Sequence, residues 1–348
     1  MSWAPLAILF MLAAALSAGV VRAMIARPIL DHPNGRKAHA RPTPKGGGLG
    51  PVLAFMLGML ALFLVMAPNP AAEAGHAAVI LAAAVIAGVS LADDIHDFRF
   101  LVKLGAQAVA ALVAIGTGLV LHTLSLPFLG PVALGPLGLA ITLLWILGCT
   151  NAVNFLDGMD GLVAGVVVIS GAALAGVAAI EGGWFIFAAA LFLTAGFLGF
   201  LPFNLPPARI FMGDVGSQFA GFMLAVLAVA AAGLDGRQVS FLIVPLLLFG
   251  LLFDAAFTLA RRALARERLS EAHRSHLYQM ALRAGVPLRH VLAAHWGFAL
   301  FHAALAFVFL ALPVELKPYV VLPPLLLQLA WLAFVLRRMR AAGVRFAG

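Results

Sequence analysis

The sequence has little charge and almost no cysteine. Only 10% of its 348 residues are charged, and 64% are hydrophobic, whereas a soluble globular chain carries about 25% charged residues. An ordinary soluble protein is therefore excluded. The one cysteine, Cys149, excludes an intrachain disulfide framework, and its apolar neighbours predict a plain core residue rather than a redox centre. No basic residue precedes the first apolar run, so a signal peptide is not expected.

Apolar stretches of about 20 residues, the length that crosses the hydrocarbon of a bilayer, recur along the whole chain. They predict an all-α, polytopic integral membrane protein whose single domain covers residues 1–348. Turn residues such as Pro68, Gly182 and Pro206 separate the stretches. The eleven predicted spans are 3–22, 48–67, 76–92, 102–121, 132–150, 162–180, 184–201, 216–233, 239–260, 291–311 and 319–337.

Basic residues lie almost entirely on one side of these spans. With the N-terminus outside and the C-terminus in the cytoplasm, 20 of the 22 Lys and Arg residues face the cytoplasm, and only Arg237 and Lys317 lie outside. This is the asymmetry that the positive-inside rule requires. The net charge of +8 therefore indicates topology and attraction to anionic lipid rather than nucleic-acid binding. The predicted cytoplasmic loops are 23–47, 93–103, 150–161, 202–215 and 261–290.

Most acidic residues fall on the same side as the basic ones. Ionisable residues near hydrocarbon are a functional hypothesis by default. Asp254, less than two turns before Arg261, is expected near the same face. The cytoplasmic carboxylates are Asp93, Asp94, Asp97, Asp157, Asp160 and Asp214. Together they predict an acidic site that faces the membrane from the cytoplasm.

The first acidic motif, Asp93-Asp94-Ile-His-Asp97, suits a divalent cation. Asp93 and Asp97 are one helical turn apart and share a face, so their charges repel unless a cation lies between them. Mg²⁺ prefers such oxygen ligands and bridges them to substrate phosphates. The alternative is a solvated helix end paired with Arg99 and Lys103.

The segment from Asn151 to Leu162 places amides and carboxylates three residues apart and interrupts them with glycines. Irregular backbone at membrane depth is tolerated where it lines protein or a watery cavity, so this segment is expected to approach a ligand. The alternative is an ordinary polar loop. Further along, Asp214 starts a span, where it is either a metal ligand or a helix cap.

Two further loops have the chemistry of anion binding. Lys45 precedes three glycines whose backbone amides could hold an anion, although the loop is not a Walker motif and could simply enforce topology. In the longest loop, His273 and His276 share a helix face beside Arg274. Phosphate oxygens are favoured over zinc because no matching Cys or third His supports a zinc site. The alternative is an amphipathic linker.

Four motifs in this order resemble the polyprenyl-phosphate N-acetylhexosamine-1-phosphate transferases, a family that includes the phospho-N-acetylmuramoyl-pentapeptide transferases. The resemblance covers nearly the whole chain. The motifs are Asp93-Asp94-Ile-His-Asp97, Asn151-x-x-Asn154-x-x-Asp157-Gly-x-Asp160-Gly-Leu162, Phe211-Met-Gly-Asp214-x-Gly-Ser217 and His273-Arg-Ser-His276-Leu.

The resemblance implies that undecaprenyl phosphate attacks a UDP-N-acetylhexosamine at the cytoplasmic face of the bacterial inner membrane, with Mg²⁺ or Mn²⁺, and releases UMP. Asp214, Asp94 and Asn154 would hold the metal. The implied catalytic residues are Asp93, Asp94, Asp157, Asp160, His273 and His276. The implied substrate-binding residues are Lys45, Asp97, Asn151, Asn154, Arg209, Phe211 and Arg274.

The late loop departs from the pentapeptide-transferase branch, because Arg274 and Ser275 separate His273 from His276. Its form is similar to members that start O-antigen-like glycans, which leaves the sugar open between an N-acetylhexosamine and a deoxy-N-acetylhexosamine. The sequence does not decide between a monomer and a homodimer. An ion-coupled secondary transporter is the alternative, and it predicts acids near the midplane and internal repeats. A CDP-alcohol phosphotransferase is disfavoured because Asp-Gly-x-x-Ala-Arg is absent after Asp157 and Asp160.

Overall fold

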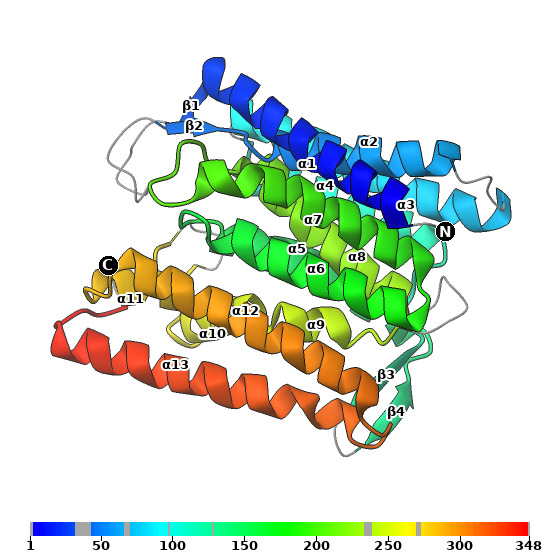
Figure 1. The fold of residues 1–348 in the computed structure, drawn as a ribbon. Helices are drawn as coiled ribbons and strands as arrows, with labels where there is room; N and C mark the ends of the chain where they lie inside the picture. The colour runs from blue at the N-terminus through cyan, green and yellow to red at the C-terminus, as the bar shows by residue number, and fades with distance from the viewer. Residues whose placement is uncertain are drawn as a thin grey trace.

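The computed structural model describes residues 3–31, 43–65, 70–96, 98–126, 129–232, 239–268 and 273–346. Long helices run side by side, with short hairpins at their ends (Figure 1). The elements are α1 (Trp3–Ala26), β1 (Ile29–Asp31), β2 (Thr43–Lys45), α2 (Leu49–Val65), α3 (Pro70–His96), α4 (Phe100–Gly116), β3 (Thr123–Leu126), β4 (Gly130–Ala133), α5 (Leu137–Leu156), α6 (Leu162–Glu181), α7 (Trp184–Asn204), α8 (Gly213–Ala231), α9 (Ile243–Leu247), α10 (Phe249–Leu264), α11 (Leu277–Arg283), α12 (Leu288–Ala311), η1 (Lys317–Val321) and α13 (Leu322–Ala341).

The described helices confirm an all-α, multi-pass membrane protein. Eight of them are long and apolar enough to cross a bilayer, and Leu49–Leu64 and Phe100–Gly116 are shorter apolar helices. Ten of the predicted spans correspond to these helices. Their number of crossings and their orientation remain predictions.

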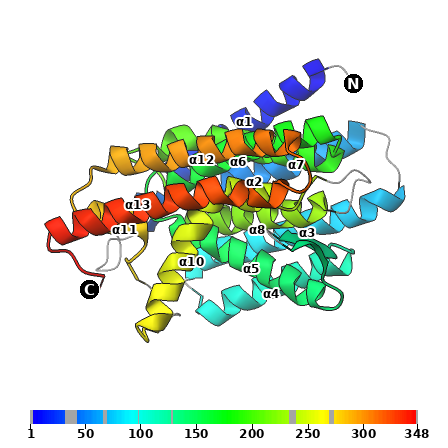
Figure 2. The ribbon, with the colours of Figure 1, turned by 90° about the horizontal axis from the view of Figure 1, so that it is seen from below.

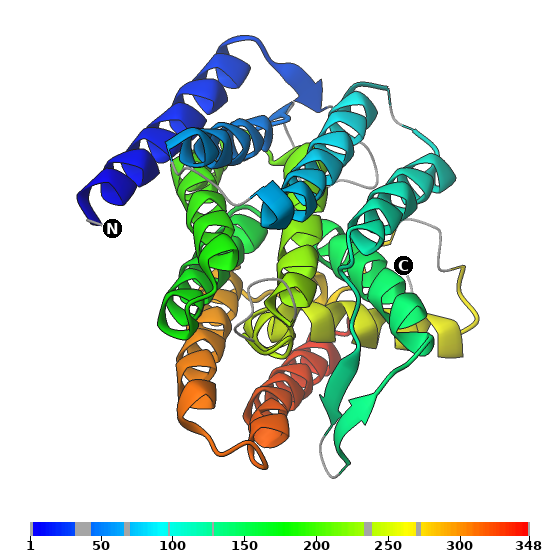
Figure 3. The same ribbon diagram turned by 90° about the vertical axis from the view of Figure 1, so that its right-hand side faces the viewer.

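The predicted span 239–260 is wrong as a single helix. The chain breaks at Leu248 between α9 and α10, where Pro245 and Gly250 flank the break and weaken a continuous helix. α10 turns away from the direction of the other helices (Figures 2 and 3). It carries Asp254, so the break takes that acidic residue out of a regular span.

Several predicted boundaries also shift. α5 continues to Leu156, so Asn151 and Asn154 lie on a helix rather than in the predicted loop 150–161. Helix α4 ends at Gly116, before the end of predicted span 102–121, and the antiparallel hairpin of β3 and β4 includes the first two residues of span 132–150. Backbone pairing in this hairpin satisfies groups that would otherwise need a helix.

Helix α8 lies at the centre of the bundle (Figure 3). Of its apolar window 94% is buried, whereas the value is 22% for α1. The start of α2 comes so close to α8 that a Cβ on Gly48 would lie 2.2 Å from the Cα of Gly216. Two glycines at one crossing let the backbones approach, as small residues do between membrane helices.

The two ends of the bundle differ. The start of α1 and the β3–β4 hairpin lie at one end, and β1, β2, α11 and the end of α13 lie at the other (Figure 1). The second end gathers the loops that carry the predicted site residues.

Candidate active site

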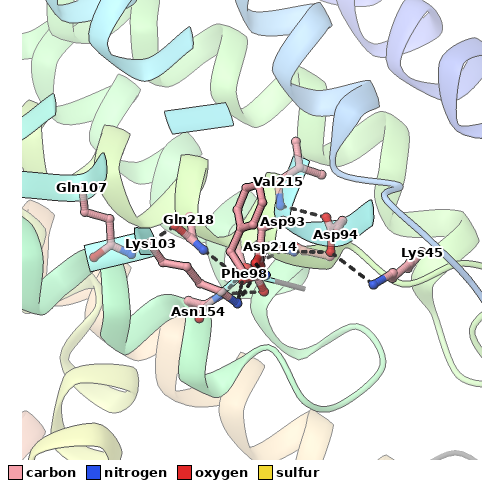
Figure 4. A network of polar contacts seen from close by, with 12 residues as sticks. Lys45, Asp93, Asp94, Phe98, Lys103, Gln107, Asn154, Asp214, Val215 and Gln218 are labelled. Atoms are coloured by element: carbon pink, nitrogen blue, oxygen red, sulfur yellow. Dashed lines mark hydrogen bonds and ion pairs between the residues drawn. The ribbon is translucent and has the colours of Figure 1, made fainter. Parts of the chain in front are cut away.

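Three carboxylates from two helices that are far apart in the sequence meet at this end. Asp93 and Asp94 lie at the end of α3 and are buried, and Asp214 lies in the first turn of α8 (Figure 4). The ammonium of Lys103, near the start of α4, lies between two of them. It is 2.6 Å from Oδ2 of Asp93 and 3.0 Å from Oδ2 of Asp214. Lys103 therefore neutralises the pair that would otherwise repel.

Asp94 is bound to the backbone that starts α8. Its Oδ1 accepts the N–H of Asp214 and its Oδ2 accepts the N–H of Val215, each at 3.2 Å (Figure 4). These are N–H groups that a helix start leaves unpaired. The cap considered for Asp214 is thus supplied by Asp94. Gly213 makes the approach possible, because its φ is +75° and a Cβ there would lie 2.5 Å from Asp94 Oδ2.

Amide side chains donate hydrogen bonds to both carboxylate oxygens of Asp214. Nδ2 of Asn154 donates to Asp214 Oδ1 at 3.1 Å, and Nε2 of Gln218 donates to Oδ2 at 2.9 Å (Figure 4). Gln107 donates to Gln218 at 3.0 Å and accepts from Asn151 at 2.6 Å. Asn151, predicted to bind substrate, therefore lies at the far end of a chain of amides that orients Asp214.

The turn between α5 and α6 carries the two other predicted acids. The backbone N–H of Ala208 donates to Asp160 at 2.9 Å, which joins this turn to the loop before α8. No described residue donates a hydrogen bond to Asp157. Burial raises the pKa of Asp157 well above its usual range, and the charges of Asp214, Asp94 and Asp160 raise the pKa further.

The glycine-rich loop does not offer its amides to an anion. The N–H groups of Gly47 and Gly48 donate to the carbonyls of Phe211 and Met212 at 2.9 and 2.8 Å. The expectation of an anion-binding loop is therefore wrong for these amides. The Nζ of Lys45 still points to the site, 4.0 Å from Asp94 Oδ1 (Figure 4).

Two predicted substrate-binding residues lie in the same loop before α8. The N–H of Phe211 donates to the carbonyl of Pro44 at 2.8 Å. Arg209 is exposed, and its guanidinium lies 5.5 Å from the ring centre of Phe203. Asp97, which was also predicted to bind substrate, lies outside the described residues.

The late loop comes to the same end of the bundle. His276 is buried, and its Nδ1 lies 3.1 Å from Oδ1 of Asp254. The Nδ1 of His273 lies 3.0 Å from the hydroxyl of Ser275. Burial lowers the pKa of His273 to about 4, and the charges of His276 and the nearby arginines add to this. His273 is therefore neutral at pH 7, and Arg274, which is partly buried, carries the positive charge between the histidines.

A salt-bridged turn supports this loop. Arg261 pairs with both oxygens of Glu267 at 2.7 and 3.0 Å, and Nε of Arg262 reaches Oε2 at 3.0 Å. The hydrogen bond from Arg261 is the main reason that the pKa of Glu267 falls to about 2. Arg261 also donates to Ser275 at 3.2 Å, so the end of α10 and the histidine loop form one unit.

The oxygens of the site suit a metal ion but do not form a complete cage among the described residues. Among the described residues, no group of three or more His, Cys, Asp or Glu side chains is arranged as a metal site. Asp157 lacks a described hydrogen-bond donor, and the amide oxygen of Asn154 is not used by the bonds that its Nδ2 makes to Asp214 and Ser217. Oxygens in an acidic turn fit Mg²⁺, which keeps several waters and needs few protein ligands.

Sequence reasoning missed residues that hold the site. Lys103 was considered only as a partner of a solvated helix end, and no role was assigned to Asp254. Both are ionisable residues next to or within apolar stretches of the sequence, which is the signal that could have found them. Gln107 and Gln218 are polar residues inside predicted spans and gave the same signal.

Comparison with known proteins identifies the family. The sequence model described as "Glycosyl transferase family 4" matches residues 76–232, which include the first three acidic motifs. A probable undecaprenyl-phosphate N-acetylglucosaminyl 1-phosphate transferase of Bacillus subtilis is 34% identical over 263 residues, which cover 75% of this chain and 71% of the relative. The chain belongs to the family of polyprenyl-phosphate N-acetylhexosamine 1-phosphate transferases.

Other members extend the likeness across two branches. A decaprenyl-phosphate N-acetylglucosaminephosphotransferase of Mycobacterium tuberculosis is 32% identical over 302 residues, 78% of this chain and 74% of the relative. A phospho-N-acetylmuramoyl-pentapeptide-transferase of Streptococcus pneumoniae is 45% identical over 100 residues, but these cover only 29% of this chain and 31% of that protein. The resemblance drawn from the four motifs is therefore confirmed at the level of the family.

Proposed function

We propose that this family member transfers the sugar-1-phosphate of a UDP-N-acetylhexosamine to undecaprenyl phosphate or a similar polyprenyl phosphate and releases UMP. The observation that carries the proposal is the meeting of Asp93, Asp94 and Asp214 at one end of the helices, with Lys45 and Lys103 beside them. The acids of an ion-coupled transporter are expected near the midplane. The placement at helix ends favours the transferase.

The chemistry asks the protein mainly to hold two phosphates and balance charge. In the proposed step, an oxygen of the lipid phosphate bonds to the β-phosphorus of the UDP-sugar, and the bond from that phosphorus to the bridging oxygen of UMP breaks. Lys45 and Lys103 provide positive charge for the two anions. Asp93 and Asp94 lie next to these lysines, where they orient them toward the lipid phosphate.

Asp214, Asp157 and the amide oxygen of Asn154 are the residues that we propose for a Mg²⁺ ion, with Mn²⁺ as a substitute. Asp157 replaces the expected ligand Asp94, because both oxygens of Asp94 accept backbone N–H groups of α8. A bound Mg²⁺ would neutralise the diphosphate and stabilise UMP as the leaving group. Asp157 is suited to this role because burial, and then three neighbouring carboxylates, disfavour its charge in the absence of a cation. The chain of Gln107 and Gln218 keeps the Asp214 carboxylate in place.

The donor substrate is assigned to residues of two loops. Arg209 and Phe211 lie in the loop before α8 and Arg274 lies in the histidine loop, and we assign them to the nucleotide sugar. The product is proposed to start a cell-envelope glycan such as an O-antigen in the bacterial inner membrane. Loss of lipid-linked glycan in a deletion strain, restored by the wild-type gene, would support this role at the start of glycan synthesis.

The test is UMP release by purified protein in detergent. Undecaprenyl phosphate is offered with a panel of UDP-N-acetylhexosamines, including deoxy sugars, in Mg²⁺, in Mn²⁺ and in EDTA. The proposal predicts release that requires the lipid and the metal and that selects a sugar. Lipid-independent release, or no release with any sugar from folded protein, would contradict it. A phosphorylated aspartate trapped without lipid would overturn direct attack in favour of a covalent route.

A further inference from the structure

The carboxylate of Asp254 is surrounded by hydrogen-bond donors inside the protein. Asp254 lies on α10 and is 2% exposed. Its Oδ1 is 3.1 Å from Nδ1 of His276 and accepts the N–H of Leu277 at 2.9 Å, and its Oδ2 accepts the N–H of Tyr278 at 3.3 Å. The hydroxyl of Thr258 adds a further bond to Oδ1 at 3.1 Å. A buried acid with so many partners has a fixed orientation.

This arrangement determines which nitrogen of His276 carries the proton. An ionised carboxylate only accepts hydrogen bonds, so the Nδ1 that faces it is the protonated nitrogen, and Nε2 has a lone pair in the form of the ring that carries one proton. Asp254 is the side-chain partner of the His276 ring, and the backbone N–H of Gln279 faces the same ring in the capping box of α11. The ring of His273 lies beside that of His276, with 4.9 Å between ring centres, and restricts its rotation.

The same carboxylate connects His276 to the acidic turn. By accepting the first N–H groups of α11, Asp254 holds Tyr278 in place. Tyr278 is fully buried, and a Cβ added to Gly158 would lie 2.2 Å from its hydroxyl oxygen. Asp157 is the residue next to that glycine. The end of α10 is therefore joined to the centre of the site through one carboxylate and one tyrosine.

We infer that Asp254 is a positioning residue of this enzyme, which fixes His276 with Nδ1 protonated and Nε2 presented to the substrate as a hydrogen-bond acceptor. Only one part of the inference rests on the proposed function, namely the identity of the substrate group that His276 contacts. In the family resemblance His276 approaches phosphate or sugar; an acceptor at Nε2 selects a hydroxyl or N–H of the nucleotide sugar rather than a phosphate oxygen. Partners that orient an active histidine typically affect activity 10- to 100-fold, roughly, when they are replaced.

The first test is a double-mutant cycle on kcat/KM for the UDP-sugar, measured by UMP release. Asp254→Asn is expected to lower kcat/KM roughly 10- to 100-fold, because an amide can turn its NH₂ toward Nδ1 and move the ring proton to Nε2. In the background of His276→Ala the same change should lower kcat/KM much less, because only the contacts of Asp254 with the start of α11 then remain to be lost. Thr194→Val is the control, since it removes a threonine hydroxyl bond within α7 that does not involve Asp254, and it should keep the wild-type kcat/KM.

An unchanged kcat/KM in Asp254→Asn, or an equal loss with and without His276, would overturn the inference. A wild-type protein without lipid-dependent release would instead contradict the proposed function. The second test does not depend on activity or on a variant of Asp254: ¹⁵N spectra of histidine-labelled wild-type protein at alkaline pH, with His276→Gln to assign the signal. The inference predicts a protonated Nδ1 and a bare Nε2 for His276, and the opposite tautomer would overturn it.

Discussion

Each carboxylate of the acidic centre is compensated in a different way. Asp93 and Asp214 share the ammonium of Lys103, and Asp94 accepts two backbone N–H groups of α8. Asp157 receives no described donor and is opposed by the other acids. A cation bound beside Asp157 would therefore have the largest effect. The charge around this residue should change most when metal and substrate bind.

Replacement of Lys103 by methionine is expected to destabilise the protein by on the order of 2 kcal/mol, between the cost of an exposed and a buried ion pair, because two carboxylates lose their shared cation. Added Mg²⁺ should raise the melting temperature of Lys103→Met more than that of the wild type, since the ion can take over part of the neutralisation. Thermal unfolding in detergent, with and without Mg²⁺, measures both effects.

Arg99→Met is the control for this experiment, because Arg99 is an exposed cation four residues away. It should change neither the melting temperature nor the response to Mg²⁺. A Lys103 variant with wild-type stability would show that the two carboxylates do not depend on this ammonium.

The histidine loop should become less stable in mild acid. The pKa of His273 is lowered to about 4 in the folded protein, whereas an unfolded histidine has a pKa of about 6.5. Above that value neither state is protonated. As pH falls from about 6.5 to about 4, only the unfolded state binds the proton, so stability decreases across this window and the loss is complete below it.

Melting temperatures of the wild type and of His273→Gln, measured from about pH 8 to about pH 4, a range that includes that window, test this expectation. The wild type should lose more than the variant as pH falls. Parallel curves for the two proteins would show that His273 binds protons equally in both states.

At the scale of elements, the start of α8 and the break before α10 decide the geometry of the site. The apolar lengths in the sequence predict ten of the helices well, because a span needs only about 20 apolar residues. They do not predict that Asp94 would cap α8, because the cap comes from a residue 120 positions earlier in the chain. They also miss the break at Leu248, since apolar residues continue on both sides of it.

Gly213→Ala should disturb the start of α8 and lower both stability and UMP release. At φ +75° an alanine is strained by about 1–2 kcal/mol, and its Cβ would meet Asp94 Oδ2 at 2.5 Å. Melting temperature and kcat in detergent measure the two effects. Gly88→Ala is the control, because a Cβ at Gly88, inside α3, meets nothing within 4 Å; it should be neutral or slightly stabilising. Wild-type behaviour of Gly213→Ala would contradict the close contact.

For the whole molecule, the sequence predicts which residues gather at one end of the bundle but not how they are paired. The asymmetry of Lys and Arg brings the acidic motifs and the late loop to one side, and the described structure places both there. The partners Lys103–Asp214 and Asp254–His276 are 111 and 22 residues apart, and only the packing of α4, α8 and α10 brings them together. Spacing along one segment carries no information about such pairs.

The predicted orientation can be tested with introduced cysteines, because the native Cys149 is only 1% exposed and should give little background. A membrane-impermeant maleimide should label Glu315→Cys in intact cells, since Glu315 is exposed at the end opposite the site. It should label Arg345→Cys only after the cells are permeabilised. The reverse pattern would place the acidic centre outside the cytoplasm.

The central claim is that the acidic centre around Asp214 carries out the transfer. It is tested most directly by UMP release from undecaprenyl phosphate and the preferred UDP-sugar, compared between wild type and Asp214→Asn in the same detergent. Glu181→Gln, at the opposite end of α6, is the matched control. The account predicts that Asp214→Asn inserts into the membrane and folds but loses activity by about a hundredfold or more, as when charge-stabilising groups are removed, while Glu181→Gln remains active. Wild-type release by folded Asp214→Asn would contradict the account.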